Sequence, residues 1–476
     1  MSVDGIQVSP SEKILAFNSQ SGNDYKYTLT LNGVTGNGVL VFSVAAGKIS
    51  DMVGNTNVST SMLVNGITID NVAPIIDLDG SVTTTKGEYI NSKDTVTIPL
   101  KITEAVGMEP SVFAKEDINV RINGLHDSNI TSVLTYVGKT GNDYKYTLTI
   151  TGITKEGQMT IEIPESKIED FATNKNQATL LSGINVIVDN TAPKVLSVVL
   201  SLDSYNNSSK LYPSSLPIEN QDWTNQTVYA VVNAEDESSG IKIYEHSIDD
   251  AVTYTQMAGA NETWENEMNK TVCYRVIDNA GNISNVVKVV IKIDRTNPKP
   301  AGLEMKENNI PYVYEAGNPA TSAIFIKPES TYDLGTFQSG ILKTEYTITY
   351  LKDGSTETLN GNVGKLLKDS GNYKIDLVTT DRAGNQATNS FNAEVRRYFE
   401  NMVKVKNIHD EGSGVKKVTI TAIDSSGNEV VNLPIDNPGA AINERIKLTE
   451  GTFTINVKIE DGVGLTETLT GQVTNN

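Results

Sequence analysis

The nine residues GNDYKYTLT occupy positions 22–30 and recur without a change at positions 141–149. Apolar side chains at Tyr25, Tyr27 and Leu29 alternate in the first copy with lysine and threonine. A period of two places the apolar side chains on one face of a β-strand and the polar side chains on the other. The stretch therefore predicts a strand with one buried and one solvent-exposed face, both at positions 22–30 and at positions 141–149.

The duplication continues downstream of this strand. Four further pairs of identical residues keep the same offset of 119 positions: Asp51 with Asp170, Asn55 with Asn174, Asp70 with Asp189, and Pro74 with Pro193. About fifty residues thus stay in step without a net gap. Self-similarity at this period is the signature of a duplicated folded unit.

A looser signature recurs five times. It reads apolar or β-branched residue, spacer, Asp, two residues, usually Gly, then usually Asn, and its aspartates are Asp51, Asp170, Asp278, Asp381 and Asp461. Their spacings of 119, 108, 103 and 80 residues each suit one β-sandwich. Alternating strands flank the signature, so we interpret it as a loop between neighbouring strands. Its Asp can accept backbone N–H groups, and its Gly or Asn tolerates positive φ.

Two more motifs mark loops and boundaries. Ser-Gly followed by Ile or Val opens a strand at Ser239, Ser339 and Ser413. Segments of the form Asp-x-x-x-Pro follow long strands at 70–74, 189–193 and 294–298, where proline ends a strand and stiffens a short linker. These signals predict five domains: 1–72, 73–192, 193–297, 298–396 and 397–476.

These motifs resemble the tandem immunoglobulin-like (Ig-like) domains of bacterial secreted and cell-surface proteins. The resemblance rests on the D-N-T-A-P junction at 189–193, the D-x-A-G-N loop and the S-G-[IV] strand start, and it covers nearly the whole chain. It implies two packed antiparallel sheets per domain and a role as spacer or adhesin. Short alternating strands without a convincing amphipathic helix predict the same all-β class. We therefore expect tandem Ig-like β-sandwich domains in an extended rod.

The first domain departs from this pattern. At the offset of 119, Met1 aligns near Val120, and the second domain has about 45 residues before that point. We therefore expect an N-terminally truncated domain that lacks one edge of each sheet or part of one sheet. An open edge of this kind invites pairing with another chain.

Composition limits the partners. The chain has 476 residues and a net charge of −19, and such a polyanion repels nucleic acid and anionic membrane surfaces. We see no signal peptide and no apolar stretch long enough to cross a bilayer. We expect no membrane insertion, an extracellular location in the secreted or cell-surface class, and flanking domains of a longer parent chain.

The sequence predicts no enzyme. The single cysteine, Cys273, reads as a small buried hydrophobe, and the three histidines lie in different repeats. No catalytic triad, P-loop or zinc spacing is present. We predict a structural stalk or adhesin segment that spaces other modules and binds a host or matrix protein or glycan. The alternative is an accessory region of a large secreted carbohydrate-active enzyme.

The Asp-x-x-x-Pro linkers also predict metal sites. In an Ig-like sandwich the preceding linker approaches the loops after the second and sixth strands. This gathers Asp70 with Glu104 and Asp170, then Asp189 with Asp236 and Asp278, then Asp294 with Asp381. Carboxylates and carbonyls are the ligands that calcium prefers. We therefore predict calcium at the junctions as the one candidate cofactor; the alternative is that these aspartates only brace their turns.

The sequence also allows predictions for the arginines near the last two junctions and for the two tryptophans. The third junction has fewer acids, with Arg295 nearby, and at the fourth junction Arg396 and Arg397 can pair with Asp410, Glu411 or Asp461 instead of an ion. Of the two tryptophans, Trp223 reads as a cap of the sandwich. Trp264, within a polar run, is the better candidate for ligand stacking.

Overall fold

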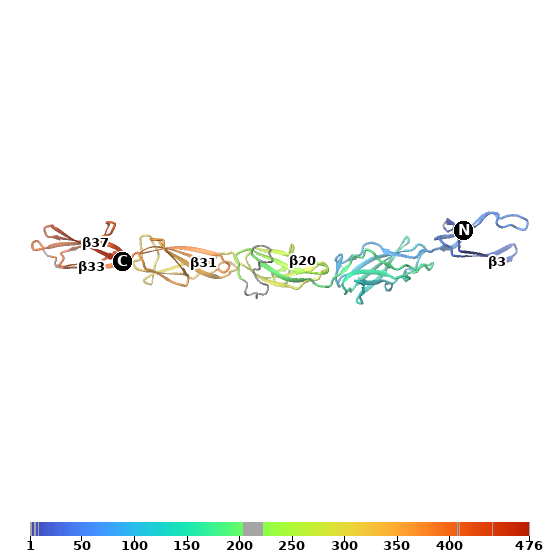
Figure 1. The fold of residues 1–476 in the computed structure, drawn as a ribbon, viewed down its shortest axis with the longest axis horizontal. Helices are drawn as coiled ribbons and strands as arrows, with labels where there is room; N and C mark the ends of the chain where they lie inside the picture. The colour runs from blue at the N-terminus through green and yellow to red at the C-terminus, as the bar shows by residue number, and fades with distance from the viewer. Residues whose placement is uncertain are drawn as a thin grey trace. The chain divides into compact units, whose positions relative to one another are not determined.

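The computed structural model describes residues 2–3, 6–7, 9–202, 222–406, 408, 410–439 and 441–475. Nearly every regular element is a β-strand (Figure 1). The helices of the described ranges are two single 3₁₀ turns, Pro110–Val112 and Lys115–Asp117. No helix in these ranges has the length and apolarity that a membrane span needs.

The chain divides into two compact units. One comprises Met1–Val199, Val231–Glu262 and Val272–Lys288, and the other comprises Leu200–Ala230, Thr263–Thr271 and Val289–Asn476. The division passes through the third predicted domain, so the five predicted boundaries stay predictions, as does the extended rod.

The second domain shows the architecture most fully. One sheet has the order β13-β14-β10-β7, and β8 also pairs with β10. The other has the order β12-β11-β15-β17-β9, and β16 also pairs with β15. The strands are β7 (Ile75–Leu78), β8 (Thr83–Thr84), β9 (Tyr89–Ile90), β10 (Val96–Thr103), β11 (Asn119–Ile122), β12 (Leu125–His126), β13 (Thr131–Thr140), β14 (Asp143–Thr151), β15 (Gly157–Ile163), β16 (Thr179–Leu180) and β17 (Ile187–Val188).

This strand order identifies the fold. If β7, β10, β11, β13, β14, β15 and β17 are lettered A to G, one sheet contains A, B, E and D, and the other contains C, F and G. That division of seven strands is the immunoglobulin arrangement. The predicted period of two is confirmed, since buried and half-buried residues alternate along the whole of β10 and β14.

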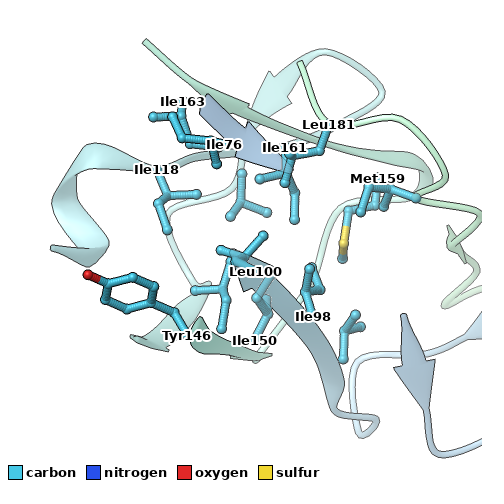
Figure 2. Packing of buried hydrophobic residues seen from close by; sticks show 14 of the residues in the cluster. Ile76, Ile98, Leu100, Ile118, Tyr146, Ile150, Met159, Ile161, Ile163 and Leu181 are labelled. Carbon is cyan, nitrogen blue, oxygen red and sulfur yellow. The ribbon is translucent and has the colours of Figure 1, made fainter. Parts of the chain in front are cut away.

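The core of the second domain lies between the two sheets (Figure 2). Ile98, Leu100 and Ile150 come from one sheet and face Met159 and Ile161 of the other. These side chains are fully buried. Burial of a large aliphatic side chain contributes about 1.5–3 kcal/mol, so this cluster holds the domain together without a disulfide.

The first domain has two separate sheets. One has the order β2-β1-β5-β6, and the other contains only β3 and β4. The strands are β1 (Ser2–Val3), β2 (Ile6–Gln7), β3 (Glu12–Ser21), β4 (Asp24–Asn32), β5 (Gly38–Val44) and β6 (Thr60–Ile69). In the described part of this domain no strand corresponds to β7 or β10, and the truncation of the domain stays a prediction.

The third domain contains seven strands in its described part. In the first compact unit β20 pairs with β21 and with β23, and Ser247 lies opposite Cys273. In the second unit Thr224 forms a parallel bridge with Ile293. The strands are β18 (Lys194–Ser201), β19 (Val228–Glu235), β20 (Ile241–Ser247), β21 (Thr255–Gln256), β22 (Asn261–Trp264), β23 (Met268–Asp278) and β24 (Val287–Ile293).

The fourth domain packs the sheet β26-β25-β27-β30 on the sheet β29-β28-β31-β32. Its buried core includes Ile326, Tyr346 and Ile375. The strands are β25 (Leu303–Glu307), β26 (Ile310–Pro311), β27 (Ile324–Pro328), β28 (Ile341–Tyr350), β29 (Thr356–Asn360), β30 (Lys365–Leu367), β31 (Gly371–Asp381) and β32 (Gln386–Val395).

The fifth domain packs the pair β33-β36 on the sheet β35-β34-β37-β38. Its core includes Ile420, Leu448 and Val457. The strands are β33 (Tyr398–Lys406), β34 (Val415–Ile423), β35 (Glu429–Asp436), β36 (Ala441–Thr449), β37 (Gly451–Asp461) and β38 (Thr466–Asn475). Tandem Ig-like β-sandwiches, the predicted fold class, are thereby confirmed.

Candidate functional site

The linker aspartates begin the candidate sites. Asp70, Asp189 and Asp294 directly follow β6, β17 and β24, the last strand of each of the first three domains. Each Oδ1 accepts the N–H of the residue two positions on, at 3.0, 3.0 and 3.1 Å. This short turn fixes the carboxylate at the strand end and leaves its Oδ2 for other partners.

The loop signature provides the second carboxylate. Oδ1 of Asp170, Asp278 and Asp381 accepts the N–H four residues on, at 2.9, 2.8 and 2.8 Å. The position before that residue has positive φ in all three loops: 70° at Thr173, 85° at Gly281 and 96° at Gly384. The predicted turn, with an Asp that accepts backbone N–H groups and a left-handed residue, is confirmed.

The asparagine of the same signature joins each loop to the preceding linker. Nδ2 of Asn174, Asn282 and Asn385 donates to its own Asp Oδ2 at 2.8 Å in every case. The same Nδ2 also donates to a linker carbonyl, that of Asp70, Asp189 or Asp294, at 3.1, 2.9 and 2.9 Å. The sequence pattern indicated only a tolerance of positive φ for this asparagine, and its role across the junction was not predicted.

The third carboxylate follows the second strand of each sandwich. Glu104 directly follows β10 and Asp236 directly follows β19, as predicted. Oε1 of Glu104 accepts the N–H of Val106 at 2.8 Å, and Oδ1 of Asp236 accepts the N–H of Gly240 at 2.6 Å.

At the third junction Asp333, after β27, takes this place, and its Oδ2 accepts the N–H of Gly340 at 2.6 Å. The expectation of fewer acids at this junction is therefore wrong. Asp333 stands six residues before Ser339, whereas Asp236 stands three before Ser239. Because the loop is longer, Asp333 did not match the sequence pattern and was not predicted. Arg295 does not compensate this cluster, because its side chain donates to Thr227 Oγ1 at 3.0 Å.

The structure thus brings three carboxylates together at each of three junctions. In every group, one ligand atom from each residue lies within 4.8 Å of the other two: Asp70, Glu104 and Asp170; Asp189, Asp236 and Asp278; Asp294, Asp333 and Asp381. Asp189, Asp278, Asp294 and Asp381 are fully buried. None of the ion pairs among the described residues involves any of these nine side chains.

The electrostatics of the clusters follow from this crowding. Burial raises the pKa of Glu104, and the neighbouring carboxylates of Asp70 and Asp170 raise it further. Burial likewise raises the pKa of Asp278, assisted by Asp189, and the pKa of Asp294, assisted by Asp333. Each junction therefore holds at least one carboxylate whose charged form is disfavoured by its surroundings.

One acceptor in the first cluster lacks a hydrogen-bond partner. In the second and third clusters Oδ2 of the linker aspartate accepts the N–H of Ser239 or Ser339, at 3.1 and 2.8 Å. Oδ2 of Asp70 is buried without a hydrogen bond among the described residues. A buried carboxylate oxygen that accepts nothing is costly unless a cation lies beside it, so the residues present fit a hard divalent ion such as calcium.

The fourth junction differs from the prediction. Arg396 pairs with Glu394 at 3.1 Å, and Arg397 lies over the ring of Phe399 at 5.2 Å from the centroid. Asp410 accepts the N–H of Gly414 at 2.7 Å. The predicted pairing of the two arginines with Asp410, Glu411 or Asp461 is wrong, because each arginine has a partner two positions away in the adjacent strand.

The remaining candidates are structural in character. Cys273 is fully buried in β23, and burial raises the pKa of its thiol, as its predicted role as a buried hydrophobe requires. Nδ1 of His246 lies 2.7 Å from Glu262 Oε1, next to Tyr274. His246 pairs with Tyr274 in the sheet, so Cys273, one residue earlier, faces the opposite side.

Trp264 ends β22 and is half-buried, and its role in ligand stacking stays a prediction. Trp223 is also half-buried and precedes the buried Thr224.

Comparisons with known proteins find likenesses among solved structures. No family model and no curated protein matches the sequence. Solved structures that align with it include a tetra-tandem repeat from the extending region of a large adhesion protein, at 14% identity and a TM-score of 0.22, covering 85% of this chain and 99% of that one. A 1.5-MDa bacterial ice-binding adhesin aligns at 14% identity and a TM-score of 0.30, covering 68% and 99%.

Fibronectin(III)-like modules of Clostridium thermocellum CbhA align at 13% identity and a TM-score of 0.20, covering 46% of this chain and 94% of that one. Likenesses at these scores say nothing about what the present chain binds. The strand order and the repeated linkers identify the fold without these comparisons. The chain is a tandem series of Ig-like β-sandwiches joined by acidic linkers.

Proposed function

We propose that this chain is a non-catalytic spacer segment of an extracellular bacterial surface protein, stiffened by calcium bound at its domain junctions. One observation carries the proposal. The same three-carboxylate group recurs at three successive junctions, each combining the linker after one domain with two loops of the next. A spacer needs junctions that resist bending, and these groups lie where bending would occur.

Charge and ligand type support calcium at these positions. Three carboxylates at one point repel one another, and no lysine or arginine among the described residues forms an ion pair with them. Calcium takes six to eight oxygen ligands, so three carboxylates with nearby carbonyls and water suit it better than zinc, which prefers nitrogen and sulfur. A bound ion would turn mutual repulsion into attraction between two domains.

Direct contacts at the second junction support a spacer role as well. Nζ of Lys86 and Nδ2 of Asn91, both from the second domain, donate to the carbonyl of Ala280 in the third, at 2.8 and 2.9 Å. The N–H of Ser92 donates to Asn190 Oδ1 at 2.6 Å. Such contacts limit rotation about the linker, and an ion at Asp189 would add to them.

Calcium titration with small-angle scattering and thermal melting tests the proposal. With calcium we expect a larger maximum dimension and a higher melting temperature than with chelator, because the ion binds the folded junction and not the unfolded chain. Asp189→Ala should weaken the response, whereas Asp461→Ala, in the loop without a linker aspartate, should leave it unchanged. Identical dimensions and melting temperatures with calcium and with chelator would reject calcium as the stiffening ion.

The adhesive role is the further part of the proposal. The segment would present other modules and contact a host or matrix protein or a glycan, with Trp264 as the candidate stacking residue. A glycan array with the whole chain and with Trp264→Ala tests this part. Binding that Trp264→Ala leaves unchanged would remove Trp264 from the role, and no binding at all would leave the spacer function alone.

A further inference from the structure

The fifth domain lacks the first strand of the sandwich. In the fourth domain β27 lies between β25 and β30, and β25 brings the buried Leu303 into the core. In the fifth domain only Arg396 and Arg397 separate β32 from β33, so there is no room for a strand before β33. Among the described residues β33 therefore pairs with β36 alone, and no strand lies beside its other edge.

Apolar surface lies open beside this edge. A hollow of about 530 Å³ lies between β33 and β38. Met402 of β33 and Leu469 of β38 line it, and they are 48% and 45% exposed. A Cβ placed at Gly471, also on its wall, would meet no atom of the described residues within 4 Å. The missing strand thus leaves one side of the sandwich uncovered, and contiguous exposed apolar surface is typical of interaction sites.

The outward-facing side chains of β33 are complementary to themselves. Exposed residues alternate along the strand with less exposed ones, and the exposed set is Tyr398, Glu400, Met402, Lys404 and Lys406. Two such strands can pair antiparallel with Met402 opposite Met402. Each Glu400 then lies opposite a Lys404, which forms an ion pair across the strands. Each Tyr398 lies opposite a Lys406, which favours a cation–π contact.

We propose that β33 pairs antiparallel with β33 of a second copy of this chain, so that two chains join side by side through their fifth domains. The two β33-β36 ribbons become one continuous sheet with a twofold axis at Met402. In this register the core-facing residues of both strands stay on one face of that sheet. The second copy's strand takes the place that β25 has beside β27 and covers the open side of the sandwich.

Charge selects this register. Lysines on an edge strand ordinarily prevent pairing with another chain. Here Glu400 stands four positions before Lys404, and the symmetric pairing turns this spacing into mutual attraction. A shift that places Lys404 opposite Lys404 is repulsive, and a shift by a single residue turns the apolar side of the strand to solvent. Nη1 of Arg445 in β36 lies 3.2 Å from Glu400, so this carboxylate would have a positive charge on each side.

The charge of the whole chain limits the affinity without preventing the pairing. Each copy has a net charge of −19, which opposes association at low salt and is screened at higher ionic strength. β33 itself contains one glutamate and two lysines, so the pairing strands do not share this excess of acid. A foreign extended segment would need an acid opposite Lys404 and a base opposite Glu400, and the second copy offers both.

Sedimentation velocity of the whole chain, in chelator and at physiological ionic strength, tests the pairing. We expect concentration-dependent dimers in the micromolar range, as for other small interfaces. Hydrogen-exchange protection of residues 398–406 should rise with chain concentration. Lys404→Glu and Glu400→Lys should each weaken the dimer about tenfold or more, because each places like charges opposite each other at two symmetric positions.

A mixture of the two variants identifies both the partner and the register. In the mixed pair the carboxylates of Lys404→Glu lie opposite the amines of Glu400→Lys. Fluorescently labelled Lys404→Glu should therefore bind Glu400→Lys more tightly than either variant binds itself. Lys416→Glu is the matched control: it makes the same change of charge at an exposed position of β34, in the other sheet, and its dimers should persist.

Each of three results would overturn the proposal. One is a chain that stays monomeric over the whole concentration range, which would leave the edge to an extended segment of another protein. Another is a dimer that Lys404→Glu and Lys416→Glu weaken equally, which would assign the effect to the charge of the chain and not to β33. The third is a mixture of the two folded variants that associates no better than each variant alone.

Discussion

The side chain of Asn282 and the backbone carbonyl of Asp189, 93 residues apart in sequence, are joined by a hydrogen bond of 2.9 Å. The same Nδ2 donates to Asp278 Oδ2 at 2.8 Å. One amide therefore holds its own loop in shape and attaches that loop to the linker from the preceding domain. Asn174 and Asn385 form equivalent bonds, so the same hydrogen bond connects loop and linker at the first and third junctions.

Asn282→Ala should destabilise the second junction. The change leaves the Asp189 carbonyl and Asp278 Oδ2 without this donor, and a buried acceptor left unsatisfied costs about 1–3 kcal/mol. We expect a lower melting temperature in calorimetry and faster hydrogen exchange in residues 276–284 and 189–195.

Asn55→Ala is its matched control. Asn55 Nδ2 donates to Asp51 Oδ2 at 2.9 Å in an exposed loop, and no linker carbonyl accepts from it among the described contacts. Its loss should affect only that loop. Equal effects of the two substitutions would show that the asparagine braces its turn and does nothing across the junction.

Thr173→Gly should stabilise the second domain. Thr173 has φ of 70°, a left-handed conformation that is strained for a β-branched residue, while glycine occupies the equivalent position in the other four loops. Relief of that strain outweighs the added freedom of glycine in the unfolded chain, so we expect a gain of about 1 kcal/mol.

Chemical denaturation measures that gain, and Gly384→Thr in the fourth domain is the reverse experiment. In the part of the chain that the structure describes, only Asn225 Nδ2, at 3.7 Å, lies near a Cβ placed at position 384, so backbone strain and not a clash would cause its loss of stability. If Thr173→Gly destabilised the domain, contacts of the threonine side chain would have to outweigh the strain.

Glu104→Gln should act in opposite directions with and without calcium. The pKa of Glu104 is raised by burial and then by Asp70 and Asp170, so the folded state binds a proton more tightly than the unfolded state does. Its contribution to stability is present at low pH and is lost as the pH rises from the ordinary value of 4.5 through the raised pKa. In chelator at pH 7, Gln removes that unfavourable charge and should raise the melting temperature.

At a pH well below 4.5 the same substitution should change little in chelator, since Glu104 is then protonated in both states. With calcium at pH 7 it should weaken the thermal shift at the first junction, because a ligand charge is lost. Melting curves at two pH values, each with calcium and with chelator, separate these effects. A Glu104→Gln protein that melts lower in chelator at pH 7 would contradict the assigned electrostatics.

Sequence periodicity was sufficient for the strands: the alternation in GNDYKYTLT correctly predicted β4 and β14 by the local rule that a strand has a period of two. The junctions needed more than a local rule. Asp70, Glu104 and Asp170, which meet within 4.8 Å, were grouped because the expected Ig-like topology places the linker and two loops at one end of the sandwich.

What could not be predicted depends on loop length and on competing partners. Asp333 was missed because it stands six positions before the serine of its Ser-Gly pair, whereas Asp236 stands three before its own. Arg396 was assigned to distant acids because sequence does not reveal that Glu394, two positions away on the strand before it, lies within 3.1 Å. The difference in exposure between Tyr27 and Tyr146 could not be predicted for the same reason, since the two nonapeptides are identical and only their neighbours differ.

Substitution of Asp333 distinguishes a metal site at the third junction from a turn that is only hydrogen-bonded. Its Oδ2 accepts from Gly340 N–H at 2.6 Å, a bond that Asn can keep through its amide oxygen, while its Oδ1 accepts from Leu334 N–H at 2.9 Å, a bond that Asn loses. Asp333→Asn should still fold and, in chelator, melt close to the parent chain, since the removed repulsion with Asp294 offsets the lost bond. With calcium, the loss of one of three ligand charges should reduce the ion-dependent rise in melting temperature of the fourth domain.

Asp424→Asn is the control, because Asp424 accepts from Asn428 N–H at 2.8 Å in an exposed hairpin without other carboxylates grouped around it in the described structure. If Asp333→Asn kept the full calcium response, or Asp424→Asn reduced it as much, the third cluster would be only a hydrogen-bonded turn.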